Sequence, residues 1–237
     1  MSDTSSANTP IVLVPGLNCS ARLYAEQILA LWQFGPVTVA DHTRDDSMTA
    51  IARRILAAAP PCFALAGLSM GGYIALEITR QAPERVARLA LLDTAARAES
   101  PEQTKARQRV IELARTGRFA EVPDLQFPVF VHRNRHGDAA LKAIVRAMAE
   151  ETGAAAFLRQ ETAIIGRADA RPGLAAIQCP TLVLVGDGDE LTPPHLSQEI
   201  AAGISGSRLV VIPDCGHLST LERPKAVNEV LVEWMRG

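Results

Sequence analysis

A serine stands among glycines where an apolar run gives way to a helical pattern. The residues are Gly67-Leu68-Ser69-Met70-Gly71-Gly72, a G-x-S-x-G motif. A serine on a sharp strand-to-helix turn needs small residues two positions before and after it, because the strand and the helix approach closely there. The spacing predicts that Ser69 is a nucleophile, and the alternative is a glycine-rich turn with a capping serine.

A serine hydroxyl needs a general base, and His217 is the histidine placed to supply one. It comes shortly after the apolar run 208–213 and follows Ser69 in the chain. That position fits the order serine, acid, histidine, which accompanies a serine on a strand-to-helix turn of this kind. His42 precedes Ser69 and so lies on the wrong side of it. The other histidines lie in a helical region or in a proline-started helix: His132, His136 and His195.

An acid must orient this base, and the loop 186–190 offers candidates directly after an apolar run. We expect Asp189 to be the acid, because it lies far enough into the loop for its side chain to turn toward His217. Asp187 is nearer the end of the run and is expected to cap the turn. Glu190 is a weaker rival.

Short apolar runs predict the strands that position these side chains: Ile11–Pro15, Val37–Ala40, Phe63–Gly67, Arg88–Leu92, Thr181–Gly186 and Arg208–Pro213. Most are continuous rather than alternating, which is typical of parallel strands buried on both faces. Asp93 directly follows the fourth run, whose end faces the same site. It is therefore an outside candidate for the acid, with a turn or cap role beside Thr94 as the alternative.

Amphipathic segments separate the runs and predict helices. Their apolar residues recur at helical spacing in three stripes: Tyr24, Ile28, Leu31 and Trp32; Met48, Ile51 and Ile55; and Val227, Val230, Leu231 and Trp234. Pro193 and Pro224 fall in first helical turns. Alternating strands and helices imply a parallel sheet with helices on both faces.

The alternation stops between Ala95 and Ile177, where only helices are predicted. A capping box at Ser100–Gln103 begins one of them, and the last covers residues 154–165. We expect an insertion that does not fold alone. The predicted organisation is a core of residues 10–95 and 171–237, a helical cap of residues 96–170, and a disordered or flexible N-terminus of residues 1–9.

Three segments together resemble the α/β-hydrolase superfamily: GLSMGG at 67–72, GDGDELTPP at 186–194 and CGHLSTLERP at 215–224. The resemblance extends from Ile11 to Trp234. It implies an α/β-hydrolase fold with about six mostly parallel strands, helices on both faces and a small helical cap. It also implies an oxyanion hole made by the backbone N–H groups of Leu17 and Met70.

The chain departs from the family pattern at two places. Many relatives have His-Gly in the loop after the first strand, where this chain has Pro15-Gly16. The backbone donors survive that change, but a side-chain contribution from histidine does not. We also expect the usual N-terminal hairpin to be missing, since ten residues precede the first run, which predicts a trimmed version of the fold.

The segment around Ser69 is similar to 3-oxoadipate enol-lactonases and small carboxylesterases. That similarity implies a serine hydrolase that cleaves a small carboxylic ester or lactone through a Ser69–His217–Asp189 triad and an acyl-enzyme. The same triad could instead serve a carbon–carbon bond hydrolase, a thioesterase or a lyase. An alternative of another class is a non-catalytic ligand-binding protein, as in hydrolase-like hormone receptors.

The cap should decide the substrate. Its phenylalanines, Phe119, Phe127, Phe130 and Phe157, are consistent with an apolar lid or with the core of the cap. The cationic segment 132–136, His-Arg-Asn-Arg-His, either binds a substrate carboxylate or is a solvated loop.

Composition excludes several classes of protein. The 237 residues carry a formal net charge of −2, which argues against a nucleic-acid binder. The 4 cysteines show no C-x-x-C spacing, so we expect neither a zinc site nor disulfides, but reduced thiols in a cytoplasmic protein. No histidines show metal-ligand spacing, and GLSMGG lacks the lysine of a phosphate-binding loop, so no cofactor is expected.

The uncharged stretch 55–76 is long enough to cross a bilayer, but its prolines and glycines would break a continuous helix. We therefore expect no membrane segment. The expected partner is a small-molecule substrate, and the expected state is a monomer or small homo-oligomer.

Overall fold

The computed structural model describes residues 9–237 and contains a six-stranded sheet in the order β2-β1-β3-β4-β5-β6. Every neighbouring pair in it is parallel. The strands are β1 (Ile11–Val14), β2 (Val37–Val39), β3 (Phe63–Leu68), β4 (Val86–Leu92), β5 (Thr181–Gly186) and β6 (Arg208–Ile212). The predicted sheet of about six mostly parallel strands is confirmed.

The central strands are apolar throughout because both of their faces are covered. In β3, Phe63 and Leu65 belong to one core cluster, whereas Ala64 and Ala66 belong to a second cluster on the opposite face. The edge strands β2 and β6 are only partly buried, since each has a neighbour on one side. The continuous apolar pattern therefore predicts the middle of the sheet better than its edges.

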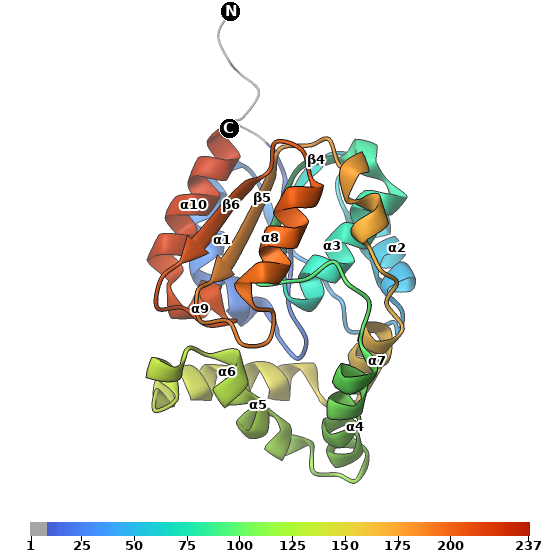
Figure 1. Ribbon diagram of the computed structural model, residues 1–237, viewed down its shortest axis with the longest axis vertical. Coiled ribbons are helices and arrows are strands. Elements are labelled where there is room, and N and C mark those ends of the chain that lie inside the picture. Colours follow the sequence, from blue (N-terminus) through green and yellow to red (C-terminus); the bar gives the residue numbers. More distant parts are fainter. Residues whose placement is uncertain (1–8) are drawn as a thin grey trace, which may run out of the picture.

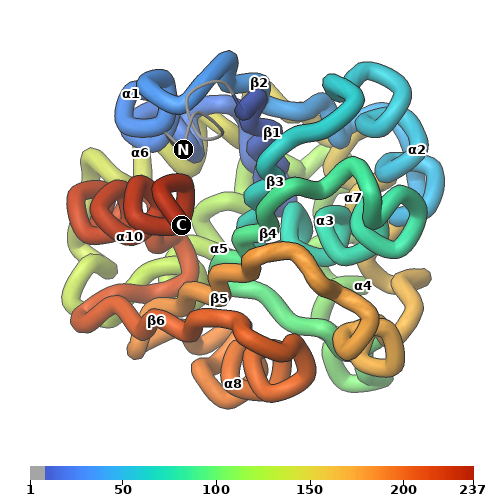
Figure 2. Tube along the Cα trace, turned by 90° about the horizontal axis from the view of Figure 1, so that it is seen from above, coloured from blue at the N-terminus to red at the C-terminus, as the bar shows by residue number. Residues whose placement is uncertain are grey.

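Helices cover both faces of the sheet (Figure 2). One core cluster joins the sheet to α2 (Met48–Ala58), α3 (Met70–Gln81) and α8 (Pro194–Gly203). The second joins it to α1 (Ala25–Leu31) and α10 (Pro224–Arg236), which pack against each other. The short helix α9 (Ser219–Glu222) precedes α10.

The predicted apolar stripe of Tyr24, Ile28, Leu31 and Trp32 is wrong at its last residue. Trp32 was expected to share the buried face of Tyr24 and Leu31, but it is 66% exposed. The α-helix ends at Leu31, and a 3-10 turn over Trp32–Phe34 follows with a tighter rotation per residue. Trp32 lies three positions after Leu29, which is 75% exposed, so the indole shares the solvent side of Leu29.

The uncharged stretch 55–76 is divided among three elements: the end of α2, all of β3 and the beginning of α3. Within residues 9–237, no helix combines the length and the apolar character that crossing a bilayer requires.

Four helices lie between β4 and β5: α4 (Pro101–Arg115), α5 (Val122–Phe130), α6 (Ala139–Thr152) and α7 (Ala154–Ile165). Figure 1 shows them as a separate layer beyond one end of the sheet. The predicted capping box is confirmed, because Ser100 Oγ accepts from the Gln103 N–H and Gln103 Oε1 accepts from the Ser100 N–H. The predicted bounds of the last helix, 154–165, are also confirmed.

The start of the chain was predicted to be disordered or flexible over residues 1–9. Residues 1–8 of that prediction lie outside the described residues. Thr9 donates its N–H to the carbonyl of Phe34 over 2.9 Å, which ties the entry of β1 to the segment before β2.

Candidate active site

Ser69 occupies the turn between β3 and α3 in a backbone conformation that few non-glycine residues adopt. Its φ is 58° and its ψ is −115°. The surrounding structure holds it there, because its N–H donates to Leu92 and its carbonyl accepts from the hydroxyl of Thr94 over 2.8 Å. The turn therefore presents the serine side chain at the carboxyl end of the sheet.

The glycines of this turn are required by close backbone contact. A Cβ on Gly71 would lie 2.0 Å from the carbonyl oxygen of Val14, and one on Gly67 would lie 2.1 Å from that of Gly71. The spacing of small residues predicted for the motif therefore has a direct steric cause.

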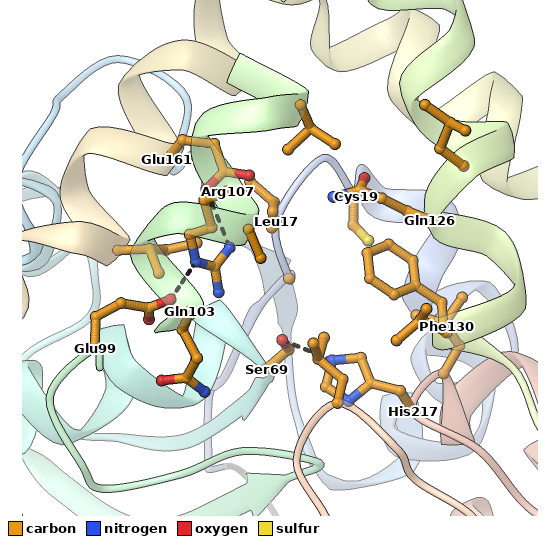
Figure 3. Close-up of a pocket in the computed structure, with 18 of the residues that line it drawn as sticks. Leu17, Cys19, Ser69, Glu99, Gln103, Arg107, Gln126, Phe130, Glu161 and His217 are labelled. Carbon is orange, nitrogen blue, oxygen red and sulfur yellow. Dashed lines mark hydrogen bonds and ion pairs between the residues drawn. The ribbon is translucent and has the colours of Figure 1, made fainter. Parts of the chain in front are cut away.

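The side chains of Ser69, His217 and Asp189 form one hydrogen-bonded line. Ser69 Oγ lies 2.8 Å from Nε2 of His217, and Nδ1 of His217 lies 2.8 Å from Oδ2 of Asp189 (Figure 3 draws the first contact). All of them are buried. A neutral imidazole that donates Nδ1–H to the carboxylate leaves Nε2 free to accept the serine proton.

Asp189 is fixed by its own loop. Oδ1 accepts the backbone N–H groups of Leu191 and Thr192, each over 2.9 Å. Oδ2 also accepts the hydroxyl of Thr192 over 2.7 Å. Sequence reasoning had given Thr192 no role in the site. In the structure this threonine orients the carboxylate that contacts His217.

The other candidate acids lie elsewhere. Asp187 Oδ1 accepts the N–H of Cys215 over 3.1 Å and so joins its loop to the segment before His217. Asp93 is fully buried; it accepts the N–H of Gly186 over 2.9 Å and the hydroxyl of Ser219. Glu190 makes no hydrogen bond to a described residue and is exposed.

The loop that carries His217 is held by a buried glutamate that sequence reasoning missed. Glu222 accepts the N–H groups of His132 over 2.8 Å and Gly216 over 3.0 Å. The backbone N–H of His217 itself donates to the carbonyl of Phe130, the last residue of α5. No signal in the sequence pointed to this role, because the contact to His132 joins residues 90 positions apart.

Of the two predicted oxyanion donors, Leu17 lies in the loop after β1 and Met70 is the first residue of α3. Within residues 9–237, the backbone N–H groups of Leu17 and Met70 donate to no protein acceptor. A Cβ built on Gly16 would lie 3.5 Å from Cβ of Ser69, which brings the Leu17 loop close to the nucleophile. His42, set aside in the sequence, lies 2.9 Å from the Gly16 carbonyl through Nε2 and fixes this loop.

Two histidines of the site have opposite pKa shifts. Burial lowers the pKa of His42, so at neutral pH its Nε2–H donates to Gly16 from an uncharged ring. Burial also acts to lower the pKa of His217, but the nearby carboxylates of Asp189 and Asp93 outweigh it and raise that pKa above its usual value.

A pocket of about 500 Å³ opens above Ser69 and His217. Leu125, Val129 and Phe130 of α5 form an apolar side of it. Helices α4 and α7 supply both the polar Gln103, Arg107 and Glu161 and the apolar Ala106, Val110, Leu113 and Ile164. All of these residues are supplied by the α4–α7 segment and the floor by the sheet loops (Figure 3).

The phenylalanines expected in this region have different roles. Phe130 lines the pocket, whereas Phe127 and Phe157 are buried in the core clusters. Phe119 packs on Phe157 with ring centroids 5.4 Å apart. The apolar side of the pocket is therefore formed largely by aliphatic residues.

The cationic segment 132–136 does not line the pocket above Ser69. His132 and Arg133 line a separate hollow of about 540 Å³ together with acidic residues. Arg135 pairs with Asp138 at 2.7 Å and donates to the carbonyl of Glu222. The segment thus stabilises the loops behind the site.

Comparison with known proteins agrees with this architecture. Residues 11–230 match the alpha/beta hydrolase family. The curated protein named "Putative carbamate hydrolase RutD" from Azorhizobium caulinodans is 30% identical, over 95% of this chain and 91% of its own. Among solved structures, an esterase from Thermogutta terrifontis has a TM-score of 0.87 and 29% identity, covering 98% of this chain and 90% of its own.

An enol-lactonase from Burkholderia xenovorans LB400 has a TM-score of 0.86 and 25% identity, covering 99% of this chain and 94% of its own. The family match covers most of the chain and includes Ser69 and His217. The match, the all-parallel sheet and the helices on both of its faces lead to one conclusion: the chain belongs to the alpha/beta hydrolase family.

Proposed function

We propose that this protein is a serine hydrolase that cleaves a small carboxylic ester or lactone through an acyl-enzyme. The observation that carries the proposal is the 2.8 Å contact between Ser69 Oγ and His217 Nε2 at the floor of a pocket. A volume of about 500 Å³ suits a small organic molecule. The similarity to an esterase and to an enol-lactonase supports the choice of ester or lactone.

In the first half of the proposed reaction, Ser69 attacks the carbonyl carbon while His217 takes the hydroxyl proton. Asp189 stabilises the imidazolium that forms. The negative charge on the former carbonyl oxygen is stabilised by the free N–H groups of Leu17 and Met70, and removal of one such donor typically costs about 100- to 1000-fold in rate.

In the second half, His217 gives its proton to the leaving alcohol oxygen, which departs and leaves the acyl group on Ser69. Water then attacks the acyl-enzyme with His217 as base, and the acid is released. For a lactone, the alcohol and the acid remain in one product. Helices α4–α7 would act as the cap that holds the substrate over Ser69.

Turnover of 4-nitrophenyl acetate tests the proposal. Wild type should show a rapid burst of nitrophenol equal to the enzyme concentration if deacylation is slower than acylation. Ser69→Ala should lose at least about 1000-fold in kcat. Ser205→Ala, at an exposed serine between α8 and β6, should match wild type.

Retained turnover in Ser69→Ala would contradict the proposal. If the protein hydrolysed a thioester or a carbon–carbon bond and not esters, Ser69 would remain the nucleophile. The proposed substrate class would then be wrong.

A further inference from the structure

Charged and amide side chains form one part of the pocket lining. We call Glu99, Gln103, Arg107 and Glu161 the polar wall; all of them line the cavity. Gln103 and Arg107 belong to α4, Glu161 belongs to α7, and Glu99 directly precedes the N-cap of α4. In Figure 3 they lie across the cavity from Phe130 and Gln126.

Arg107 joins the two carboxylates of this wall. Its Nε donates to Glu99 Oε1 over 2.6 Å, and its Nη1 donates to Glu161 Oε2 over 3.0 Å. Arg167 donates to the other oxygen of Glu99. Two arginines and two glutamates therefore share the network, and its formal charges cancel.

Two residues of the cavity lining each keep one hydrogen-bonding atom that the network does not use. Glu161 Oε1 is buried and accepts no hydrogen bond from residues 9–237. Arg107 Nη2 donates none to that part of the chain, and Figure 3 shows the guanidinium end of Arg107 pointing into the space above Ser69. Glu161 lines the cavity, and the residue is 0% exposed.

Burying a carboxylate oxygen without a hydrogen-bond partner raises the free energy of the folded protein. A ligand that donates a hydrogen bond to this oxygen removes most of that penalty and therefore binds more tightly. The neighbouring guanidinium N–H of Arg107 can donate a hydrogen bond to an acceptor on the same ligand. An anionic ligand would gain from Arg107 but would meet the free oxygen of Glu161 and the charge of Glu99. The wall therefore favours a neutral group that both donates and accepts.

We infer that Arg107 and Glu161 form a specificity subsite for a neutral donor–acceptor group, such as a primary carboxamide or a hydroxyl, on the substrate cleaved at Ser69. In a carboxamide, the carbonyl would accept from Arg107 Nη2 and the NH₂ would donate to Glu161 Oε1. The inference rests on the proposed function, since it names the substrate class of the same site.

The same four side chains could instead serve only to fasten α4 to α7. A structural role predicts no discrimination between ligands that differ in one donor. The matched pair is a carboxamide and a methyl ketone, because the ketone keeps the acceptor and the approximate shape but lacks the N–H.

The experiment measures kcat/KM for three series of 4-nitrophenyl esters at pH 8, with the acyl chain varied in length and ending in a carboxamide, a methyl ketone or a carboxylate. At the chain length that reaches the polar wall, wild type should prefer the carboxamide to the ketone by about tenfold, as for a hydrogen bond to a charged group. The carboxylate should be the poorest of the three.

Glu161→Gln provides the decisive variant. Its amide oxygen can still accept from Arg107, while its NH₂ takes the place of the free oxygen and offers a donor. The carboxamide-to-ketone ratio should therefore fall by about tenfold or more, and the carboxylate should improve. Glu112→Gln, on the exposed side of α4, is the control and should keep the wild-type ratio.

Binding of the same esters to Ser69→Ala, measured by calorimetry, separates this inference from the proposed function. A ratio of dissociation constants near one for carboxamide and ketone at every chain length would overturn the subsite, whether or not wild type hydrolyses the esters. So would a ratio that Glu161→Gln leaves unchanged. Selective binding without hydrolysis would uphold the subsite and overturn the serine-hydrolase proposal.

Discussion

Asp189 Oδ2 lies 2.8 Å from Nδ1 of His217, and the carboxylate of Asp93 is buried nearby without bonding to that ring. Two carboxylates thus approach one histidine, but only one of them can fix its tautomer. Asp93 instead joins the N–H of Gly186 at the end of β5 to the hydroxyl of Ser219 at the start of α9.

This difference predicts opposite results for two matched substitutions. Asp189→Asn should lower kcat for 4-nitrophenyl acetate by about 1000- to 10000-fold, because the amide cannot hold the tautomer that accepts the serine proton. Asp93→Asn should stay within about tenfold of wild type, since its oxygen can accept from Gly186 and its NH₂ can donate to Ser219. Equal losses in both variants would contradict the assignment of Asp189.

The pH dependence of kcat/KM follows from the raised pKa of His217. Below that pKa the imidazole is protonated and cannot act as a base, so activity should rise with pH and reach half its maximum above pH 6.5. Asp189→Asn removes the carboxylate that raises the pKa and should move the midpoint to lower pH in its residual activity. If the pH profile of wild-type kcat/KM had its midpoint at or below pH 6.5, the pKa of His217 would not be raised.

The positive φ of Ser69 predicts a stability difference between two inactive variants. Both Ser69→Gly and Ser69→Ala lose the hydroxyl, but only alanine keeps a Cβ in the strained conformation. Ser69→Gly should therefore be more stable than Ser69→Ala by about 1 kcal/mol in denaturant unfolding. Ser205 is the control, because its φ is not positive, and there the glycine variant should not be more stable than the alanine variant. If glycine and alanine differed in stability by the same amount at both positions, Ser69 would not be strained.

The buried charges behind the polar wall predict a large effect of Arg167 on folding. Its guanidinium lies 4.3 Å from the ring centroid of Tyr73, donates to Glu99 and is nearly inaccessible to water. Arg167→Leu should lower the free energy of unfolding by about 3 kcal/mol, because Glu99 loses a charged partner in the interior.

Arg118→Leu is the matched control, since Arg118 and Glu121 pair on the surface with both side chains about half exposed. Arg118→Leu should lower the free energy of unfolding by no more than about 0.5 kcal/mol. Thermal or denaturant unfolding of the two variants makes the comparison, and similar losses would show that the buried network contributes little.

The sheet and the Ser69–His217–Asp189 line could be predicted from the sequence for a physical reason. Parallel strands bring their carboxyl ends to one edge, so polar residues that follow different strands converge there even when they are far apart in the chain. The short apolar runs mark the strands, and the glycines around Ser69 mark the one turn that needs close backbone approach.

The substrate-facing side of the pocket could not be predicted in the same way. Arg107 and Glu161 are 54 positions apart on two helices, and their contact depends on how α4 packs on α7. Helical periodicity gives the buried face of each helix but not which partner it meets. The four phenylalanines show the limit. The sequence left both an apolar lid and the core of the cap open for them, and only Phe130 of that set lines the pocket.

The central claim, that Ser69 is an activated nucleophile, is tested most directly by covalent labelling of the folded protein with a fluorophosphonate and mapping of the labelled peptide by mass spectrometry. Wild type should gain one phosphonyl group, on Ser69, and the labelling should be lost in Ser69→Ala and strongly slowed in His217→Ala. An unlabelled wild type, or a label on another residue that persists in Ser69→Ala, would contradict the account.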